Sequence, residues 1–151
     1  MKFKVLILSA VVLFASCGGS SNQKAPGTAA SQDVSSYDPN RGEGKFTTVD
    51  IPSTLDAGKA AEGEKIYNVK CNACHKLTDE KLVGPGWKGV TSRHTAVWIM
   101  NFATNTDDMI DKDPKVQALL EVCLVRMPNQ NLSDEDARNI YEFMRKNDGV
   151  K

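Results

Sequence analysis

The sequence predicts an all-α domain that follows a long N-terminal segment without a core of its own. Apolar residues recur at the spacing of a helix face in several stretches between residues 47 and 151, and none of these stretches alternates with the period of a strand. Residues 18–44 are instead rich in Gly, Ser, Ala, Gln and Pro and lack apolar periodicity. About 105 residues remain for the globular part, which is enough for one domain and too few for two.

Residues 1–16 have the features of a secretory signal peptide. Lys2 and Lys4 supply its positive charge, and an apolar stretch over residues 5–14 follows. About ten apolar residues are too few to cross a bilayer, which takes about 20. Leu13-Phe14-Ala15-Ser16-Cys17 resembles the lipobox of bacterial lipoproteins, in which the cysteine is lipidated and becomes the new N-terminus. We expect Cys17 to carry this lipid; the alternative is a plain cleaved signal that leaves Cys17 as an incidental thiol.

A lipid on Cys17 would place the protein on the periplasmic or cell-surface side of a bacterial membrane, with residues 17–46 as a flexible, disordered tether. A flexible chain of this length has a typical end-to-end distance of about 30 Å and a stretched limit of about 100 Å. Such a tether would let the domain move between partners at the membrane surface. A disordered leader without this role is the alternative.

Helix caps and apolar spacing predict the helices of the domain, which spans residues 47–151. Asp56 is a suitable N-cap for a first helix that ends near Lys70. Apolar runs predict a second helix over residues 96–103 and a third over residues 114–124, the latter beginning with a proline. The apolar face of the first helix comprises Ala60, Gly63, Ile66 and Tyr67.

The last predicted helix has the clearest start. Ser133 followed by Asp136 resembles a capping box, and the acidic residues 134–136 suit the positive end of a helix dipole. We expect this helix to end near Lys146. Its broad apolar surface comprises Ile140, Tyr141, Phe143 and Met144.

The run Cys71-Asn72-Ala73-Cys74-His75 directly follows the first helix and carries the chemistry of the chain. On a helical turn, positions i and i+3 share one face at about 5 to 6 Å. Both thiols can therefore form thioethers with the two vinyl groups of one porphyrin, while His75 ligates its iron. The spacing predicts one covalently bound haem c, with Cys71 and Cys74 as its attachment points.

Two other uses of a Cys-x-x-Cys pair remain open at this point. A thioredoxin-like redox site needs a βαβ unit around it, and no strand pattern is present in the domain. A zinc site would have to recruit the distant Cys123, and the adjacent ligands Cys74 and His75 would strain a tetrahedral geometry.

The second axial ligand decides whether the iron is closed for electron transfer or open for chemistry. Met100 and Met144 fall in apolar helical patterns and are expected to pack in the core. Met109 lies in an acidic stretch where we expect exposure, and His94 is a bis-histidine alternative in a polar loop. Met127 stands in a turn-rich segment before Pro128, from which its thioether can reach a haem face. We therefore expect His75 and Met127 to be the iron ligands, although a loop methionine can also be a packing anchor.

Several motifs in this order resemble the class I monohaem cytochromes c over the whole of residues 47–151. Besides the haem motif, they are Val83-Gly84-Pro85, Arg126-Met127-Pro128 and Leu132-Ser133-Asp134-Glu135 before the last helix. The resemblance implies the class I cytochrome c fold, a small helical domain wrapped around one covalent haem. It also implies that Pro85 lies on the His75 side and that a backbone carbonyl there accepts the second imidazole N–H. The first and last helices are then expected to cross near Gly63, Tyr67, Ile140, Phe143 and Met144.

Three further residues have two interpretations each. Arg93 and Trp98 are candidate contacts of the haem carboxylates, which need donors when partly buried; otherwise Arg93 is a solvated loop charge and Trp98 fills the core. Cys123 has no counterpart in the family pattern. We expect it to be a buried, inert thiol, although an odd cysteine in an exported protein can also pair between molecules.

Charge excludes a nucleic-acid binder and suggests a protein partner. The formal net charge of the chain is zero, and loss of Lys2 and Lys4 leaves it near −2. Basic residues cluster around the haem motif, whereas an acidic stretch covers residues 107–113. We expect the basic group to guide docking onto an acidic redox partner, unless these are ordinary solvated faces. The group comprises Lys65, Lys70, Lys76, Lys81, Lys88 and Arg93.

Together these observations predict a one-electron carrier in a respiratory chain and not an enzyme. Its haem c would be closed by His75 and Met127, its redox partners would be proteins, and its membrane contact would be the lipid on Cys17. Two alternatives remain: a five-coordinate haem enzyme or gas sensor, and a haem subunit that relays electrons inside a larger oxidoreductase complex.

Overall fold

The computed structural model describes residues 37–151, and these residues confirm the predicted all-α fold. Their regular elements are helices, and the only β pairing among them is an isolated bridge between His75 and Lys81. Residues 1–16, Cys17 and the tether as far as residue 36 lie outside the described residues. The helices are α1 (Ala57–Lys70), α2 (Val90–Arg93), α3 (Ala96–Thr104), α4 (Thr106–Lys112), α5 (Pro114–Cys123) and α6 (Asp134–Asn147).

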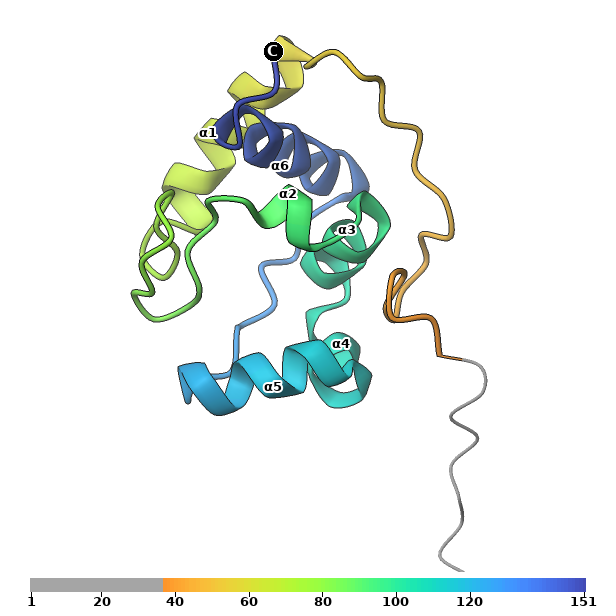
Figure 1. Cartoon of the computed structure of the whole chain (residues 1–151), viewed down its shortest axis with the longest axis vertical. Helices are drawn as coiled ribbons and strands as arrows, with labels where there is room; N and C mark the ends of the chain where they lie inside the picture. The colour runs from red at the N-terminus through yellow and green to blue at the C-terminus, as the bar shows by residue number, and fades with distance from the viewer. Residues whose placement is uncertain (1–36) are drawn as a thin grey trace, which may run out of the picture. The chain divides into compact units, whose positions relative to one another are not determined.

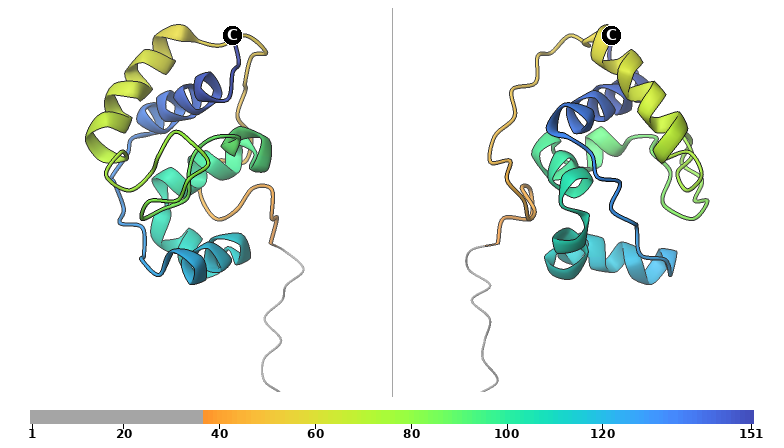
Figure 2. Two further views of the ribbon diagram at one scale, coloured as in Figure 1. Left: turned by 60° about the vertical axis from the view of Figure 1, so that its left-hand side comes forward. Right: turned by 180° about the vertical axis from the view of Figure 1, so that it is seen from behind.

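The crossing of α1 and α6 is the central contact of the fold (Figures 1 and 2). Gly63 permits this close approach, because a Cβ there would lie 2.6 Å from the carbonyl carbon of Asn139 and 2.9 Å from the Cβ of Phe143. The ring of Tyr67 packs on that of Phe143, with centroids 5.4 Å apart. The crossing expected near Gly63, Tyr67 and Phe143 is therefore confirmed.

Both crossing helices begin where the sequence predicts. The Asp56 side chain accepts a hydrogen bond from the Lys59 N–H at 2.9 Å and caps α1. Ser133 and Asp136 form the reciprocal capping box of α6, with the Asp136 N–H donating to Ser133 Oγ at 3.1 Å. These contacts satisfy N–H groups that have no partner within their own helix.

Between the crossing helices, α3 and α5 match the predicted segments, whereas α4 is a finding of the structure. The expectation that Met109 is exposed was wrong: its side chain is completely buried. Met109 and Ile110 form the inner face of α4, and the acidic residues point outward. Asp113 then caps α5, accepting from the N–H groups of Lys115 and Val116 at 2.8 and 3.0 Å.

Residues 37–55, which we call the N-terminal strap, run beside α3 before the chain enters α1 (Figure 1). The buried Asn101 side chain of α3 bonds to the strap three times: it accepts from the Phe46 N–H at 2.9 Å and donates to the carbonyls of Arg41 and Phe46 at 3.0 Å. Arg41 and Phe46, which lie within the predicted tether, are thus hydrogen-bonded to α3.

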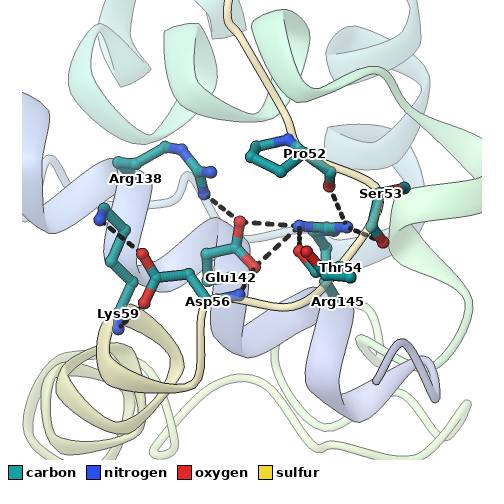
Figure 3. A network of polar contacts seen from close by, with 8 residues as sticks. All are labelled: Pro52, Ser53, Thr54, Asp56, Lys59, Arg138, Glu142 and Arg145. Carbon is teal, nitrogen blue, oxygen red and sulfur yellow. Dashed lines mark hydrogen bonds and ion pairs between the residues drawn. The ribbon is translucent and has the colours of Figure 1, made fainter.

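The other end of the strap is bound to α6 through a buried ion pair (Figure 3). Glu142 is completely buried, and the Arg145 guanidinium donates to its carboxylate at 2.8 and 2.9 Å. Arg145 also donates to the carbonyls of Pro52 and Ser53, at 2.7 and 3.0 Å. The strap and the last helix are therefore joined by one polar cluster, to which the N–H of Asp56, the N-cap of α1, also donates at 3.4 Å.

No helix within residues 37–151 has the length and apolar character needed to cross a membrane.

Candidate haem site

The attachment motif forms a tight turn directly after α1. The N–H groups of Cys74 and His75 donate to the Cys71 carbonyl at 3.0 and 2.9 Å. Cys71 is buried and Cys74 is half-buried. Burial raises the pKa of the Cys71 thiol to about 11.

His75 is held in one orientation from three directions. Its Nδ1 lies 2.8 Å from the Pro85 carbonyl oxygen. A carbonyl can only accept, so Nδ1 carries the proton and Nε2 keeps its lone pair for a metal. Burial lowers the pKa of His75, which favours this neutral form. The Tyr67 hydroxyl donates to the His75 carbonyl at 2.7 Å, and Gly84 lies against the imidazole ring. Pro85 thus has the expected place beside His75.

Two adjoining cavities of about 80 and 130 Å³ open between the motif and α5. Cys74 borders the first cavity and Cys71 borders the second. Their shared walls include both proposed iron ligands. The side chains that line both cavities are His75, Pro85, Phe102, Leu119 and Met127. These apolar walls, with a cysteine at each cavity, fit a flat cofactor attached to Cys71 and Cys74, and His75 and Met127 are side chains there that would be able to ligate its iron.

Among the alternative sixth ligands, Met127 has the position best suited to the role. Met127 is half-buried and lines both cavities. Met144 and His94 line only the larger cavity, and Met100 and Met109 line neither. Met100 and Met144 are buried in the core, as expected.

The two candidate carboxylate contacts have different surroundings. Arg93 is exposed at the larger cavity, where its guanidinium donates to the carbonyls of Lys88 and Gly86 at 2.6 and 3.1 Å. Trp98 lines the same cavity, but its indole N–H donates to Asp113 at 2.7 Å. The Trp98 donor is thus used by Asp113, and a contact of Trp98 with a haem carboxylate stays a prediction.

His94 stacks on Trp98, with centroids 3.9 Å apart and planes 12° apart. Burial lowers the pKa of His94 to about 4, and nearby Lys115 and Arg93 act in the same direction. His94 is therefore a neutral, packed imidazole at pH 7. Its Nδ1 is buried without a hydrogen-bond partner among the described residues.

The surroundings of Cys123 bear on two expectations, a buried thiol and a zinc site. Cys123 is half-buried and lines the smaller cavity, so its thiol is less enclosed than we expected. Within residues 37–151, no three His, Cys, Asp or Glu side chains are grouped so that they can share a metal ion. The structure does not assemble the four ligands of the zinc alternative.

Sequence reasoning missed two parts of this site. Phe102 and Leu119 line both cavities, although nothing in the sequence separates them from other core residues. Asp113 is completely buried and accepts from Trp98 and from the Tyr37 hydroxyl. Because Asp113 directly precedes Pro114, the sequence indicates that a helix begins there. That Asp113 also accepts from the Trp98 indole depends on packing between distant residues and is not visible in the sequence.

The fold and the site define a c-type cytochrome with a single haem attachment motif. A family profile described as Cytochrome c matches residues 60–148, and the chain belongs to this family. Its cofactor is a covalently attached haem c, and its class is the electron-carrying cytochromes c.

Solved structures and one curated relative agree with this assignment. The cytochrome c from Rhodothermus marinus is 36% identical, with a TM-score of 0.67 over 70% of this chain and 90% of that one. An engineered form of it, bound to a carbene intermediate, is 35% identical with a TM-score of 0.63 and the same coverage. The cytochrome c-type cyt cy of Rhodobacter capsulatus is 44% identical over 45 residues. That match spans 30% of this chain and only 22% of the relative.

Proposed function

We propose that this protein carries single electrons through a haem c whose iron is ligated by His75 and Met127, and that it is not an enzyme. The observation that carries the proposal is that these two side chains line both cavities, one of which is bordered by Cys74 and the other by Cys71. With the His75 imidazole and the Met127 thioether both bound, the iron would have no open position for an external ligand, and methionine ligation would raise its reduction potential.

The residues around the site suit this task. When bound, the haem supplies the one-electron couple of its iron. His75 is fixed by the Pro85 carbonyl, so its ring does not have to turn when the iron changes oxidation state. Phe102 and Leu119 make the walls apolar and limit access of water to the iron.

A visible spectrum of the ferric protein, with and without Met127→Ala, tests the ligation. We expect a weak charge-transfer band near the red end of the spectrum that disappears in the variant. An unchanged low-spin spectrum in the variant would refute Met127 as the ligand and favour His94. Met144→Leu is a matched control because Met144 lines only one of the cavities.

We further propose that the carrier works at the external face of a bacterial membrane, within a respiratory chain, and is anchored through Cys17. The lipobox-like sequence supports this proposal. Mass spectrometry of the mature protein from its host should find a diacylglyceryl group on Cys17. Cys17→Ser should release the haem domain into the soluble fraction; retention of the variant in the membrane would contradict the anchor.

Redox proteins with acidic surfaces are the proposed partners. Lys70 and Lys81 are exposed near the haem motif and donate to the carbonyls of Gln130 and Val122, at 2.8 and 3.0 Å. A neutral carbonyl does not offset the positive charge of Lys70 or Lys81. The charges of Lys65 and Lys76, by contrast, are offset by ion pairs with Glu62 and Glu80. Electron-transfer rates with an acidic redox protein should therefore fall as ionic strength rises. Rates that stay flat would exclude electrostatic steering.

A further inference from the structure

The segment that carries Met127 has little backbone support of its own. Residues 125–132, which we call the ligand loop, follow α5 and precede the cap of α6. No backbone–backbone hydrogen bond within the described part of the chain involves these eight residues. Two further bonds, from Gln130 to the Pro128 carbonyl and from the Asn131 N–H to Asn129, stay inside the loop. Its position must therefore come from packing and from side chains that reach other elements.

Arg126, immediately before Met127, connects the loop to α4. Its guanidinium donates to Asp111 Oδ1 at 2.8 Å and to the Asp107 carbonyl at 3.4 Å, and it lies 3.5 Å from the Asp107 carboxylate. Both acidic residues stand on the outer face of α4, and Met109 and Ile110 bury the opposite face. The arginine is thus attached to a helix that is itself fixed in the core.

Lys70 makes the second connection, to Gln130 of the loop, which lies three residues after Met127. This last residue of α1 donates from Nζ to the Gln130 carbonyl at 2.8 Å. It directly precedes Cys71, one of the two haem attachment points. The loop is therefore connected on one side of Met127 to α4 and on the other side to the helix that leads into the attachment motif.

We propose that Arg126 and Lys70 are positioning residues that hold the Met127 thioether on the haem iron and so keep the sixth position closed. This inference rests on the proposed ligation by Met127. Each contact restrains the loop backbone close to the ligand, so losing either one raises the fraction of molecules in which the thioether has left the iron. An external ligand can bind only to that open fraction.

Imidazole is a suitable probe, because its binding to the ferric haem can be followed by the Soret spectrum of the intact holoprotein. We expect Arg126→Gln to raise the apparent imidazole affinity about two- to fivefold, the range of exposed ion pairs. Lys70→Ala, which removes a hydrogen bond to the Gln130 carbonyl, should raise it in the same direction. Arg126→Lys should recover part of the difference. High salt should raise the affinity of the unmodified protein more than that of Arg126→Gln, because salt screens the pair.

Matched controls separate positioning from a general effect of surface charge. Lys112 pairs with Asp108 on the same short helix, and Lys65 pairs with Glu62 on α1. Neither of these ion pairs involves a residue of the ligand loop. Lys112→Gln and Lys65→Gln should therefore leave imidazole affinity unchanged. Asp111→Asn should raise it by itself and add little to Arg126→Gln, as expected for two ends of one interaction.

Unchanged affinity in both loop variants, or an equal rise in the two controls, would overturn the inference. Met127→Ala distinguishes this failure from failure of the ligation itself. If Met127→Ala binds imidazole much more tightly while Arg126→Gln and Lys70→Ala do not, Met127 is the ligand and only the positioning role is wrong. If Met127→Ala binds imidazole as the unmodified protein does, the proposed ligation fails.

Discussion

The Nδ1 atom of His75 lies 2.8 Å from the carbonyl oxygen of Pro85, ten residues further along the chain. This bond assigns the proton to Nδ1 and directs Nε2 toward the cavities. It also links the haem motif to the Gly84-Pro85 turn, so the orientation of the axial histidine depends on backbone geometry outside the motif.

Gly84→Ala should disturb this relationship. A Cβ at position 84 would lie 2.8 Å from His75 Nδ1 and 2.9 Å from Nε2, closer than ordinary van der Waals contact. We expect a loss of about 1–3 kcal/mol in unfolding free energy, the usual cost of overpacking, together with a changed Soret spectrum. Urea unfolding and visible spectroscopy measure both effects, and a variant with unchanged spectrum and stability would show that the ring can move aside.

Gly63→Ala tests the crossing of α1 and α6. The added methyl would meet the backbone of Asn139, which cannot move as a side chain can, so we expect a loss of at least about 1–3 kcal/mol. Gly58→Ala is the matched control on the same helix, where the nearest atom is Asp56 Oδ1 at 3.4 Å. The control should keep its stability or gain slightly, because alanine has the higher helix propensity and meets no close neighbour there. Equal effects at the two positions, measured by urea unfolding, would mean that the crossing does not need a glycine.

The crossing helices α1 and α6 could be predicted because their start signals are local in sequence. Helix α4, the position of the strap and the Trp98–Asp113 bond could not, because they depend on contacts between distant residues. The caps at Asp56 and Ser133 depend on residues three positions away, and the sequence displays them directly. The sequence did not predict helix α4 because its residues are mostly polar or acidic. Only Met109 and Ile110 are apolar, and their burial depends on packing against residues that are distant in sequence. The order of residues 37–46 likewise depends on Asn101, about 55 residues away. At the site, the motif predicted His75, but the pairing of Trp98 with Asp113 required the structure.

Removal of the buried carboxylate of Glu142 should be among the most destabilising single changes in the domain (Figure 3). Glu142→Ala leaves the buried Arg145 guanidinium with backbone carbonyls but no carboxylate, and breaking a buried ion pair typically costs about 3–5 kcal/mol. Glu64→Ala is the control, since the Glu64–Lys146 pair at 2.9 Å is about half exposed and should contribute less than about 1 kcal/mol. Thermal and urea unfolding of the two holoproteins measure the difference. Similar losses for both variants would contradict a special role of burial.

Asp56, the N-cap of α1, should make the free energy of unfolding depend on pH below about pH 4. Hydrogen bonding to Lys59 lowers the pKa of Asp56 below its ordinary value of 3.8. Because the folded pKa lies below the unfolded one, the Asp56 carboxylate stabilises the fold above about pH 4, and this contribution disappears as the pH falls through the folded pKa. Asp56→Asn keeps an oxygen to accept from the Lys59 N–H but cannot titrate. The urea midpoint of the unmodified protein should therefore exceed that of Asp56→Asn by a constant amount from pH 5 to 7, and the difference should shrink between pH 4 and 3. Other carboxylates titrate equally in both proteins, so a difference that is the same at pH 3 and pH 7 would show that the Asp56 charge contributes nothing.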